Sequence, residues 1–177
     1  MRYRDQPTVE VETKVSAPPE QVWAAVTDIR LPVDLPGELQ DAQWLDGADG
    51  PVVGARFVGR NEIENVGKTE TVCTVVDVEP GRRWVWSVNA GAGSGASGPN
   101  ETGDLEPWAQ WGFEVDPSRE GSVVRQFARI GLAPSPLKAA IDANPELEGR
   151  IIARRLAGFR DAMTANLEEV RRRCEDG

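Results

Sequence analysis

One amphipathic pattern near the C-terminus limits the folds open to this chain. From Leu147 to Cys174 the apolar residues recur at spacings of three and four, which is typical of a single long helix. They are Ile152, Leu156, Phe159, Met163, Leu167 and Val170. At about 1.5 Å per residue, roughly 25 residues span close to 40 Å. The helix is therefore long enough to cross a whole small sheet.

The residues before this helix predict that sheet. Thr8 to Val15 alternates between apolar and charged side chains, the pattern of a half-buried strand. Further strand-like segments follow at 39–45, 54–63, 69–80, 82–88, 108–115 and 122–132. The connections are short, and Pro80-Gly81 has the composition of a tight turn. Strands joined in this way predict an antiparallel meander.

A double proline separates the first strand from a short helix. Pro18 and Pro19 fit only the first turn of a helix, where the missing N–H groups have no intrahelical partner. An apolar stripe follows at Val22, Trp23, Val26 and Ile29, so Trp23 is assigned to the core. The order strand, helix, strands, long helix predicts an α+β fold with helices on one face of the sheet. We expect one domain over residues 1–177, with its core at about 8–174.

Composition excludes several classes of function. Lys and Arg total 20 against 29 Asp and Glu, and the resulting net charge of −9 argues against a nucleic-acid partner. No apolar run approaches the length of a membrane span and no secretory leader opens the chain, so a cytoplasmic protein is expected. Cys73 and Cys174 lie far apart, which favours reduced thiols over a disulfide.

With this order in place, the opening residues resemble a known superfamily. "VSAPPEQVWAAVTD" (15–28) is similar to the first strand and helix of the SRPBCC or START-like helix-grip proteins, which include polyketide cyclases and lipid-transfer domains. "WLDG", "VGARFVGRN", "VVDVEPGRRWVWSV", "WGFEV" and "GSVVRQF" follow in the expected order and most resemble the polyketide cyclase/dehydrase-like branch. The resemblance implies a curved antiparallel sheet of about seven strands around the long C-terminal helix. Short helices are expected between strands one and two, and a cavity between sheet and helix.

The same resemblance, with the alternation of the strands, predicts which side chains line that cavity. The predicted ligand-binding residues are Phe57, Asn61, Thr74, Trp84, Trp86, Trp111, Phe113 and Gln126 on the sheet, and Phe159 and Met163 on the helix. An aromatic lining with a few uncharged polar groups suits a flat apolar ligand. The alternative is that these residues fill a solid core. Six tryptophans in 177 residues favour the cavity, because packing alone rarely needs so many wide rings.

No catalytic set is evident, and the catalytic residues stay unknown at this stage. The chain has no histidine, which removes the commonest general base and metal ligand, and neither a metal nor another cofactor is expected. Arg56, Arg60, Glu62 and Glu114 fall on the face opposite the predicted lining, although a one-residue slip would carry any of them inside. The only tyrosine, Tyr3, precedes the first strand.

Three connections are expected to lie around the cavity mouth by resemblance. They are "ENVGK" (64–68), the glycine-rich "GAGSGASG" (91–98) within the 90–106 connection, and the segment 133–149. Mobile segments in such positions can gate a ligand.

Three functions fit this sequence. The first is binding of a small hydrophobic, aromatic or polyketide-like molecule. The second is a polyketide cyclase or dehydratase that acts through cavity shape and a few polar groups, without a metal or nucleotide cofactor. The third is a protein–protein docking module. The expected partner is a small hydrophobic molecule, and the protein is expected to be a monomer or a homodimer.

Overall fold

A computed structural model describes residues 1–91 and 106–176, and its central feature is one antiparallel sheet. The seven strands lie in the order β1-β7-β6-β5-β4-β3-β2, so the sheet begins and ends with the first two strands of the chain. The strands are β1 Thr8–Val15, β2 Leu39–Trp44, β3 Arg56–Ile63, β4 Gly67–Glu79, β5 Arg83–Ala90, β6 Ala109–Ser118 and β7 Gly121–Ile130. The sequence prediction of a seven-stranded antiparallel sheet is confirmed.

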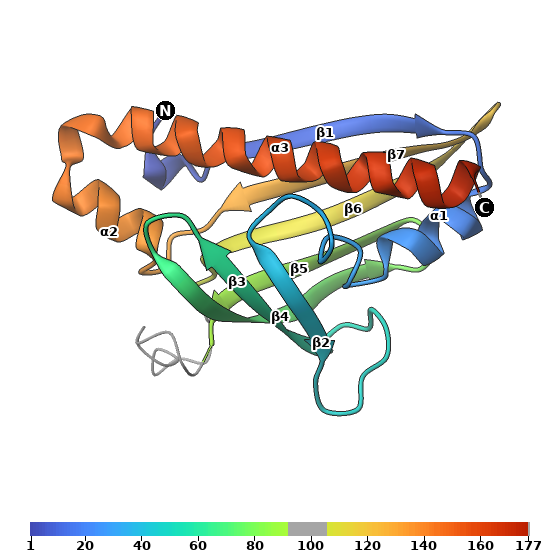
Figure 1. Cartoon of the computed structure of the whole chain (residues 1–177), viewed down its shortest axis with the longest axis horizontal. Coiled ribbons are helices and arrows are strands. Elements are labelled where there is room, and N and C mark those ends of the chain that lie inside the picture. The colour runs from blue at the N-terminus through green and yellow to red at the C-terminus, as the bar shows by residue number, and fades with distance from the viewer. Residues whose placement is uncertain (92–105, 177) are drawn as a thin grey trace.

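The helices lie on the concave face of this sheet (Figure 1). They are α1 Pro19–Val26, α2 Pro136–Ala143 and α3 Glu148–Glu175, with 3₁₀ turns at Tyr3–Asp5 and Pro145–Leu147. The helical region predicted between the first two strands consists of α1 followed by turns. The segment 133–149, predicted as a mobile connection, instead contains α2, whose first turn is capped by the Ser135 hydroxyl accepting from Lys138 N–H at 3.1 Å. Most of the glycine-rich segment 91–98 lies outside the described residues.

Helix α3 runs the length of the molecule and packs chiefly along β1 (Figure 1). Buried apolar residues form two clusters, one toward each end of the helix. The first contains Leu167 and Val170 of α3 together with Val22 and Val26 of α1. The second contains Ile152, Leu156, Phe159 and Met163 of α3 together with Tyr3, Ile130 and Ile141. One face of the helix is therefore packed along most of its length, chiefly against β1, and the neighbouring face is left to look toward the central strands.

A bulge in β4 sets the register between the tight turn and the centre of the sheet. Gly81 has a φ of +79°, and Arg82 N–H donates to Glu79 O at 2.9 Å, the pattern of a turn with Pro80 before glycine. Val75 pairs with Trp86 and Asp77 with Val85, so Val76 is the extra residue. Val76 accordingly points away from the concave face and is 41% exposed.

Charged residues of alternating sign cross the convex face of the sheet from β4 to β1. Asp77 pairs with Arg83 at 2.9 Å, Arg83 with Glu114, and Glu114 with Arg125 at 2.8 Å. Arg125 then reaches Glu12 at 2.8 Å. Single exposed pairs stabilise a protein little, but this chain of pairs links five neighbouring strands and opposes a slip of any one.

On the same face, a phenyl ring fills the space left by a missing side chain. Gly112 of β6 stands opposite Phe127 of β7, and a Cβ at Gly112 would lie 2.4 Å from the Phe127 ring and 2.9 Å from Trp84 O. Arg83 lies over the outer side of the ring, 5.2 Å from its centroid. The ring thus covers the backbone of β6 only because residue 112 is glycine.

The replacement Gly112→Ala is expected to lower the free energy of unfolding by about 1–3 kcal/mol, because the added methyl forces Phe127 out of its place. Urea denaturation followed by circular dichroism measures this. Gly50→Ala is the matched control, since a Cβ there meets nothing within 4 Å. Equal stability of the two variants would contradict the packing described for Phe127.

The C-terminal end of α3 is tied to the loop after α1 by an ionic network. Arg173 donates to Glu169 at 2.7 Å and to Asp28 at 2.8 Å, while Arg172 donates to Glu169 at 2.7 and 2.8 Å. These two guanidinium groups lower the pKa of Glu169 to about 2. A carboxyl whose pKa falls on folding stabilises the folded state when ionised.

The variant Glu169→Gln should therefore be less stable than wild type at neutral pH. The difference should be present above about pH 4.5, the ordinary value for the group, and should disappear as the pH falls to about 2. Thermal unfolding by circular dichroism between pH 2 and 7 measures it. Glu168→Gln, at the neighbouring exposed position, is expected to change little, and a Glu169 effect independent of pH would show that the ionic network does not produce it.

Candidate ligand cavity

A partly open cavity of about 570 Å³ lies between the sheet and α3. Strands β3 to β7 form its floor, the middle of α3 its roof, and the segment 28–39 between α1 and β2 one side. The start of α2, the β3–β4 hairpin and Trp108 surround the other end. This volume lies within the range of sites for small organic ligands. The predicted cavity is therefore present, and the alternative of a solid core does not hold.

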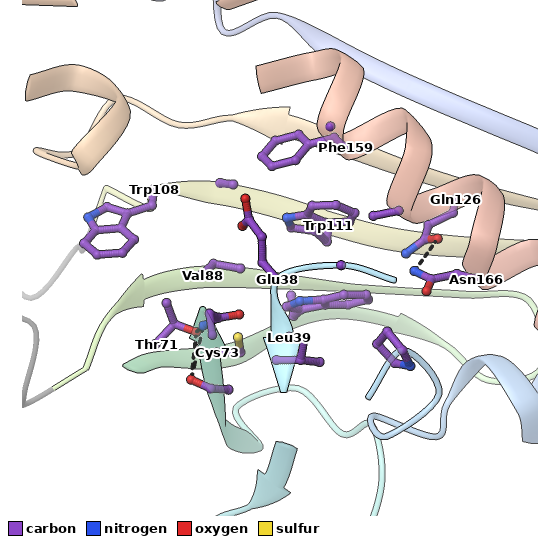
Figure 2. Close-up of a pocket in the computed structure, with 18 of the residues that line it drawn as sticks. Glu38, Leu39, Thr71, Cys73, Val88, Trp108, Trp111, Gln126, Phe159 and Asn166 are labelled. Atoms are coloured by element: carbon purple, nitrogen blue, oxygen red, sulfur yellow. Dashed lines mark hydrogen bonds between the residues drawn. The ribbon is translucent and has the colours of Figure 1, made fainter. Parts of the chain in front are cut away.

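The floor of the cavity is aromatic. Trp86 of β5 and Trp111 of β6 are direct cross-strand partners, and both are only partly buried. Trp84 lies behind Trp86, with ring centroids 4.3 Å apart and planes at 28°, and it is fully buried. Phe159 of α3 meets Trp111 edge to face at 4.8 Å (Figure 2). The floor thus presents the rings of Trp86 and Trp111 and has Trp84 as its support.

Two amide side chains stand together between β7 and α3. Asn166 Nδ2 donates to Gln126 Oε1 at 3.1 Å, and both residues are almost fully buried (Figure 2). Within the described residues, the Gln126 nitrogen and the Asn166 oxygen make no other hydrogen bond, although both residues line the cavity. If the oxygen and nitrogen of both amide groups were exchanged, one hydrogen-bond donor and one acceptor would still remain free. A donor and an acceptor are therefore available side by side to a bound molecule.

A second polar group lies on β3 and β4. Asn61 Nδ2 donates to Thr71 Oγ1 at 3.2 Å and to Gly59 O at 3.3 Å. Cys73, two residues further along β4, is buried in the same wall, and burial raises the pKa of its thiol to about 12. The thiol is therefore protonated at neutral pH and is a poor nucleophile.

Charged side chains line the cavity at the side formed by segment 28–39. Arg155 of α3 forms a two-pronged pair with Glu38, in which Nη1 meets Oε1 and Nη2 lies 3.1 Å from Oε2. The guanidinium carbon also lies 4.5 Å from the centroid of the Phe159 ring. Figure 2 shows Glu38 reaching from the start of β2 toward Phe159. The other lining carboxylate on this segment, Asp28, is paired with Arg173.

The described residues offer neither a metal site nor a membrane span. Within 1–91 and 106–176, no cluster of three or more metal-ligating side chains is placed to hold an ion. None of the helices in that part of the chain is long and apolar enough to cross a membrane.

Comparison with known families agrees with this architecture. The profile of the family described as polyketide cyclase / dehydrase and lipid transport matches residues 6–175. The chain belongs to this polyketide cyclase / dehydrase family. A search of curated proteins gave no match.

Solved structures similar to this family member cover nearly all of it. A polyketide-cyclase-like protein of Corynebacterium glutamicum, Cgl2372, is 27% identical with a TM-score of 0.57, over 93% of this chain and 89% of that one. StfQ, a di-domain ARO/CYC of the steffimycin biosynthetic pathway, is 16% identical with a TM-score of 0.67, over 96% and 50%. BexL, the di-domain ARO/CYC of the BE-7585A pathway, is 12% identical with a TM-score of 0.63, over 96% and 50%. The two di-domain proteins are similar in fold.

Eight of the ten residues predicted as ligand-binding stand on the wall of the family member's cavity. They are Phe57, Asn61, Trp84, Trp86, Trp111, Phe113, Gln126 and Phe159. Their contact with a ligand stays a prediction. Trp23, which the sequence assigned to the core, packs against the first apolar cluster and does not line the cavity.

The prediction that Thr74 faces the cavity is wrong. Cys73 pairs with Phe57 of β3, so Thr71 and Cys73 face inward and Thr74 faces outward. Counting back from the Pro80-Gly81 turn in steps of two leads to Val76 and Thr74, but the bulge at Val76 reverses the faces at that point. Val72, two residues before Thr74, also does not line the cavity.

The prediction for Met163 is also wrong. Met163 is fully buried in the second apolar cluster and is not among the residues that line the cavity. The residues of α3 that line the cavity are Phe159 of the apolar stripe and the residues beside that stripe, namely Arg155, Gly158, Asp161, Ala162 and Asn166. These positions follow the spacing of one helix face. Two of them are small, which leaves the space that the cavity occupies.

The four charged residues whose direction the sequence left open lie outside the cavity. Arg56 pairs with Asp46 at 2.6 Å, Arg60 with Asp41 at 2.8 Å, and Glu114 joins the charges of the convex face. Glu62 is exposed and does not line the cavity either.

The sequence prediction missed the charged pair and part of the polar lining. Glu38, Arg155, Thr71, Trp108 and Asn166 all line the cavity. The small residues at 158 and 162, beside a stripe of large apolar ones, are the signal by which Arg155 and Asn166 could have been found. Glu38 follows a series of turns in an irregular segment and carries no such signal.

The raised pKa of Cys73 gives a direct test of its burial in the cavity wall. In the variant Cys174→Ser, we expect the remaining thiol to react very slowly with Ellman's reagent at pH 8, because only about 10⁻⁴ of it is ionised when the pKa is about 12. Absorbance at 412 nm follows the reaction. The same variant unfolded in urea is the control and should react at once; equally fast reaction of the folded protein would contradict the burial.

Proposed function

We propose that this protein binds a small apolar molecule with at least one flat ring in the cavity under α3. One observation carries the proposal: the cavity of about 570 Å³ has a floor of two partly buried, cross-strand tryptophans. Leaving wide aromatic faces uncovered forfeits packing that a solid core would gain. A ring stacked on Trp86 and Trp111 restores those contacts.

Polar groups at one end of the cavity support an oriented mode of binding. The free donor of Gln126 and the free acceptor of Asn166 suit a hydroxyl, or a carbonyl beside one. Both groups are neutral, so they can remain buried without a ligand at far lower cost than a charge would incur. Apolar stacking would supply most of the affinity and the amide pair the orientation.

The polyketide cyclase or dehydratase activity is a second candidate. Membership of the family supports this activity, and so does one feature of the site. The free N–H of Gln126 can donate to a carbonyl oxygen of the substrate, and the free oxygen of Asn166 can accept from the O–H of the enol form. Such an enzyme would act by folding a flexible chain against the aromatic floor. An assay in which the protein is incubated with a short linear poly-β-ketone, and cyclised product is detected by mass spectrometry, distinguishes this activity from binding without turnover.

The test of the binding proposal uses N-phenyl-1-naphthylamine, a neutral aromatic probe that fluoresces in apolar surroundings. Trp111→Leu should weaken probe binding about tenfold, because one stacking face is lost. Trp111 is only partly buried, so the loss of stability should be modest. Fluorescence titration gives the Kd and urea denaturation gives the stability.

Two further variants sharpen this test. Trp23→Leu removes a partly buried ring that packs against the first apolar cluster and does not line the cavity, so it should cost some stability and leave the Kd of the folded protein unchanged. Gly158→Leu should fold normally, because a Cβ there meets nothing within 4 Å, yet should block the cavity. Undiminished probe binding by both Trp111→Leu and Gly158→Leu would refute the proposed site.

A further inference from the structure

One cation stands among the described residues that line the cavity, and it is Arg155. Its guanidinium is held from two sides, by the Phe159 ring at 4.5 Å and by the carboxylate of Glu38. The planar group presents two parallel N–H bonds to that carboxylate, the geometry in which arginine recognises planar anions. The structure thus contains a formed carboxylate site that opens on the cavity and is occupied by the protein's own side chain.

Glu38 can leave this site without a change in the backbone. Its carbonyl accepts from Glu62 N–H at 2.7 Å, and the next residue, Leu39, already pairs with Asn61 of β3. Its side chain is 39% exposed and that of Arg155 is 29% exposed. A rotation about side-chain bonds therefore moves the carboxylate into water, where its charge is fully hydrated. Partly exposed pairs of this kind are weak, so a competing carboxylate can replace Glu38.

We propose that Arg155 binds a carboxylate of the ligand and that Glu38 occupies the same position when the cavity is empty. The inference rests on the proposed function and narrows its ligand class to apolar ring-bearing carboxylic acids. The ring system lies on Trp86 and Trp111, and the carboxylate takes two hydrogen bonds from the guanidinium. Glu38 turns outward in the bound state, because two carboxylates beside one arginine repel each other.

The roof of the cavity also limits the size of the ligand. Arg155 and Asn166 are eleven residues apart, which is three turns along one face of α3 or roughly 16 Å. Gly158 and Ala162 lie between them and leave the space open. A ligand that uses both polar ends therefore carries its carboxylate and its hydroxyl or carbonyl at opposite ends of an extended body. Shorter acids can use the Arg155 end alone.

The experiment displaces bound N-phenyl-1-naphthylamine with either 2-naphthoic acid or 2-naphthamide at pH 7.5, where the acid is ionised. The two competitors share one ring system and differ in charge. Wild type should bind the acid about tenfold more tightly than the amide. Arg155→Met should bind both as weakly as wild type binds the amide. Glu38→Gln should strengthen acid binding severalfold and leave amide binding unchanged, because it removes only the competing charge.

Arg154→Met is the matched control. Arg154 is the neighbouring residue on α3, pairs with Glu64 at the surface and does not line the cavity, so its loss should preserve the preference for the acid. Thermal unfolding confirms that all variants are folded. Equal affinity of wild type for the two competitors, or a preference that survives Arg155→Met, would overturn the carboxylate site while leaving the proposed function intact. Failure of the neutral probe itself to bind would overturn both.

Discussion

The packing of one long helix against one edge of the sheet determines everything else in this structure. Helix α3 has two neighbouring stripes, and the one with large apolar residues, such as Ile152 and Leu167, is buried in the clusters at either end. Burial of each such side chain contributes about 1.5–3 kcal/mol. These contacts fix the apolar face of the helix against the sheet, chiefly along β1. The second stripe, with Gly158 and Ala162, can therefore remain apart from the sheet, and the cavity stays open.

The distribution of polarity follows from the energy of burying charge. Deep in the cavity the polar groups are neutral and paired, as in Gln126 with Asn166 and Asn61 with Thr71. The charged side chains among the described lining residues are Asp28, Glu38, Arg155 and Asp161, and each is exposed or only partly buried, so water still reaches them. Consequently the deep end can orient a ligand by hydrogen bonds, whereas only the rim can recognise its charge.

The sequence predicted the elements of the fold well, because each depends on local patterns. The alternation of apolar and polar residues predicted the strands, and the double proline predicted the start of α1. The spacing of apolar residues by three and four predicted α3. The sequence does not show which side chains of β4 face the cavity, because both faces of the strand carry apolar residues. The bulge at Val76 also depends on pairing with β5. The contact of Glu38 with Arg155 joins residues 117 positions apart and has no local signature. Where periodicity alone decides, prediction succeeded; where register or long-range contact decides, it did not.

The bulge at Val76, which made the predicted faces of β4 wrong, also decides which residues of β4 lie beside the aromatic floor. Trp84 and Trp86 face the same side because they are two residues apart on β5. The bulge places Val78 opposite Trp84 and Val75 opposite Trp86, so both rings have apolar neighbours beside them. Trp84 is then fixed by its indole N–H, which donates to Val26 O of α1 at 3.1 Å. Trp86 stacks on this immobile ring, so its exposed face is ordered before any ligand arrives. A ring that binds there therefore loses little side-chain entropy in the protein, and the favourable stacking is retained as affinity.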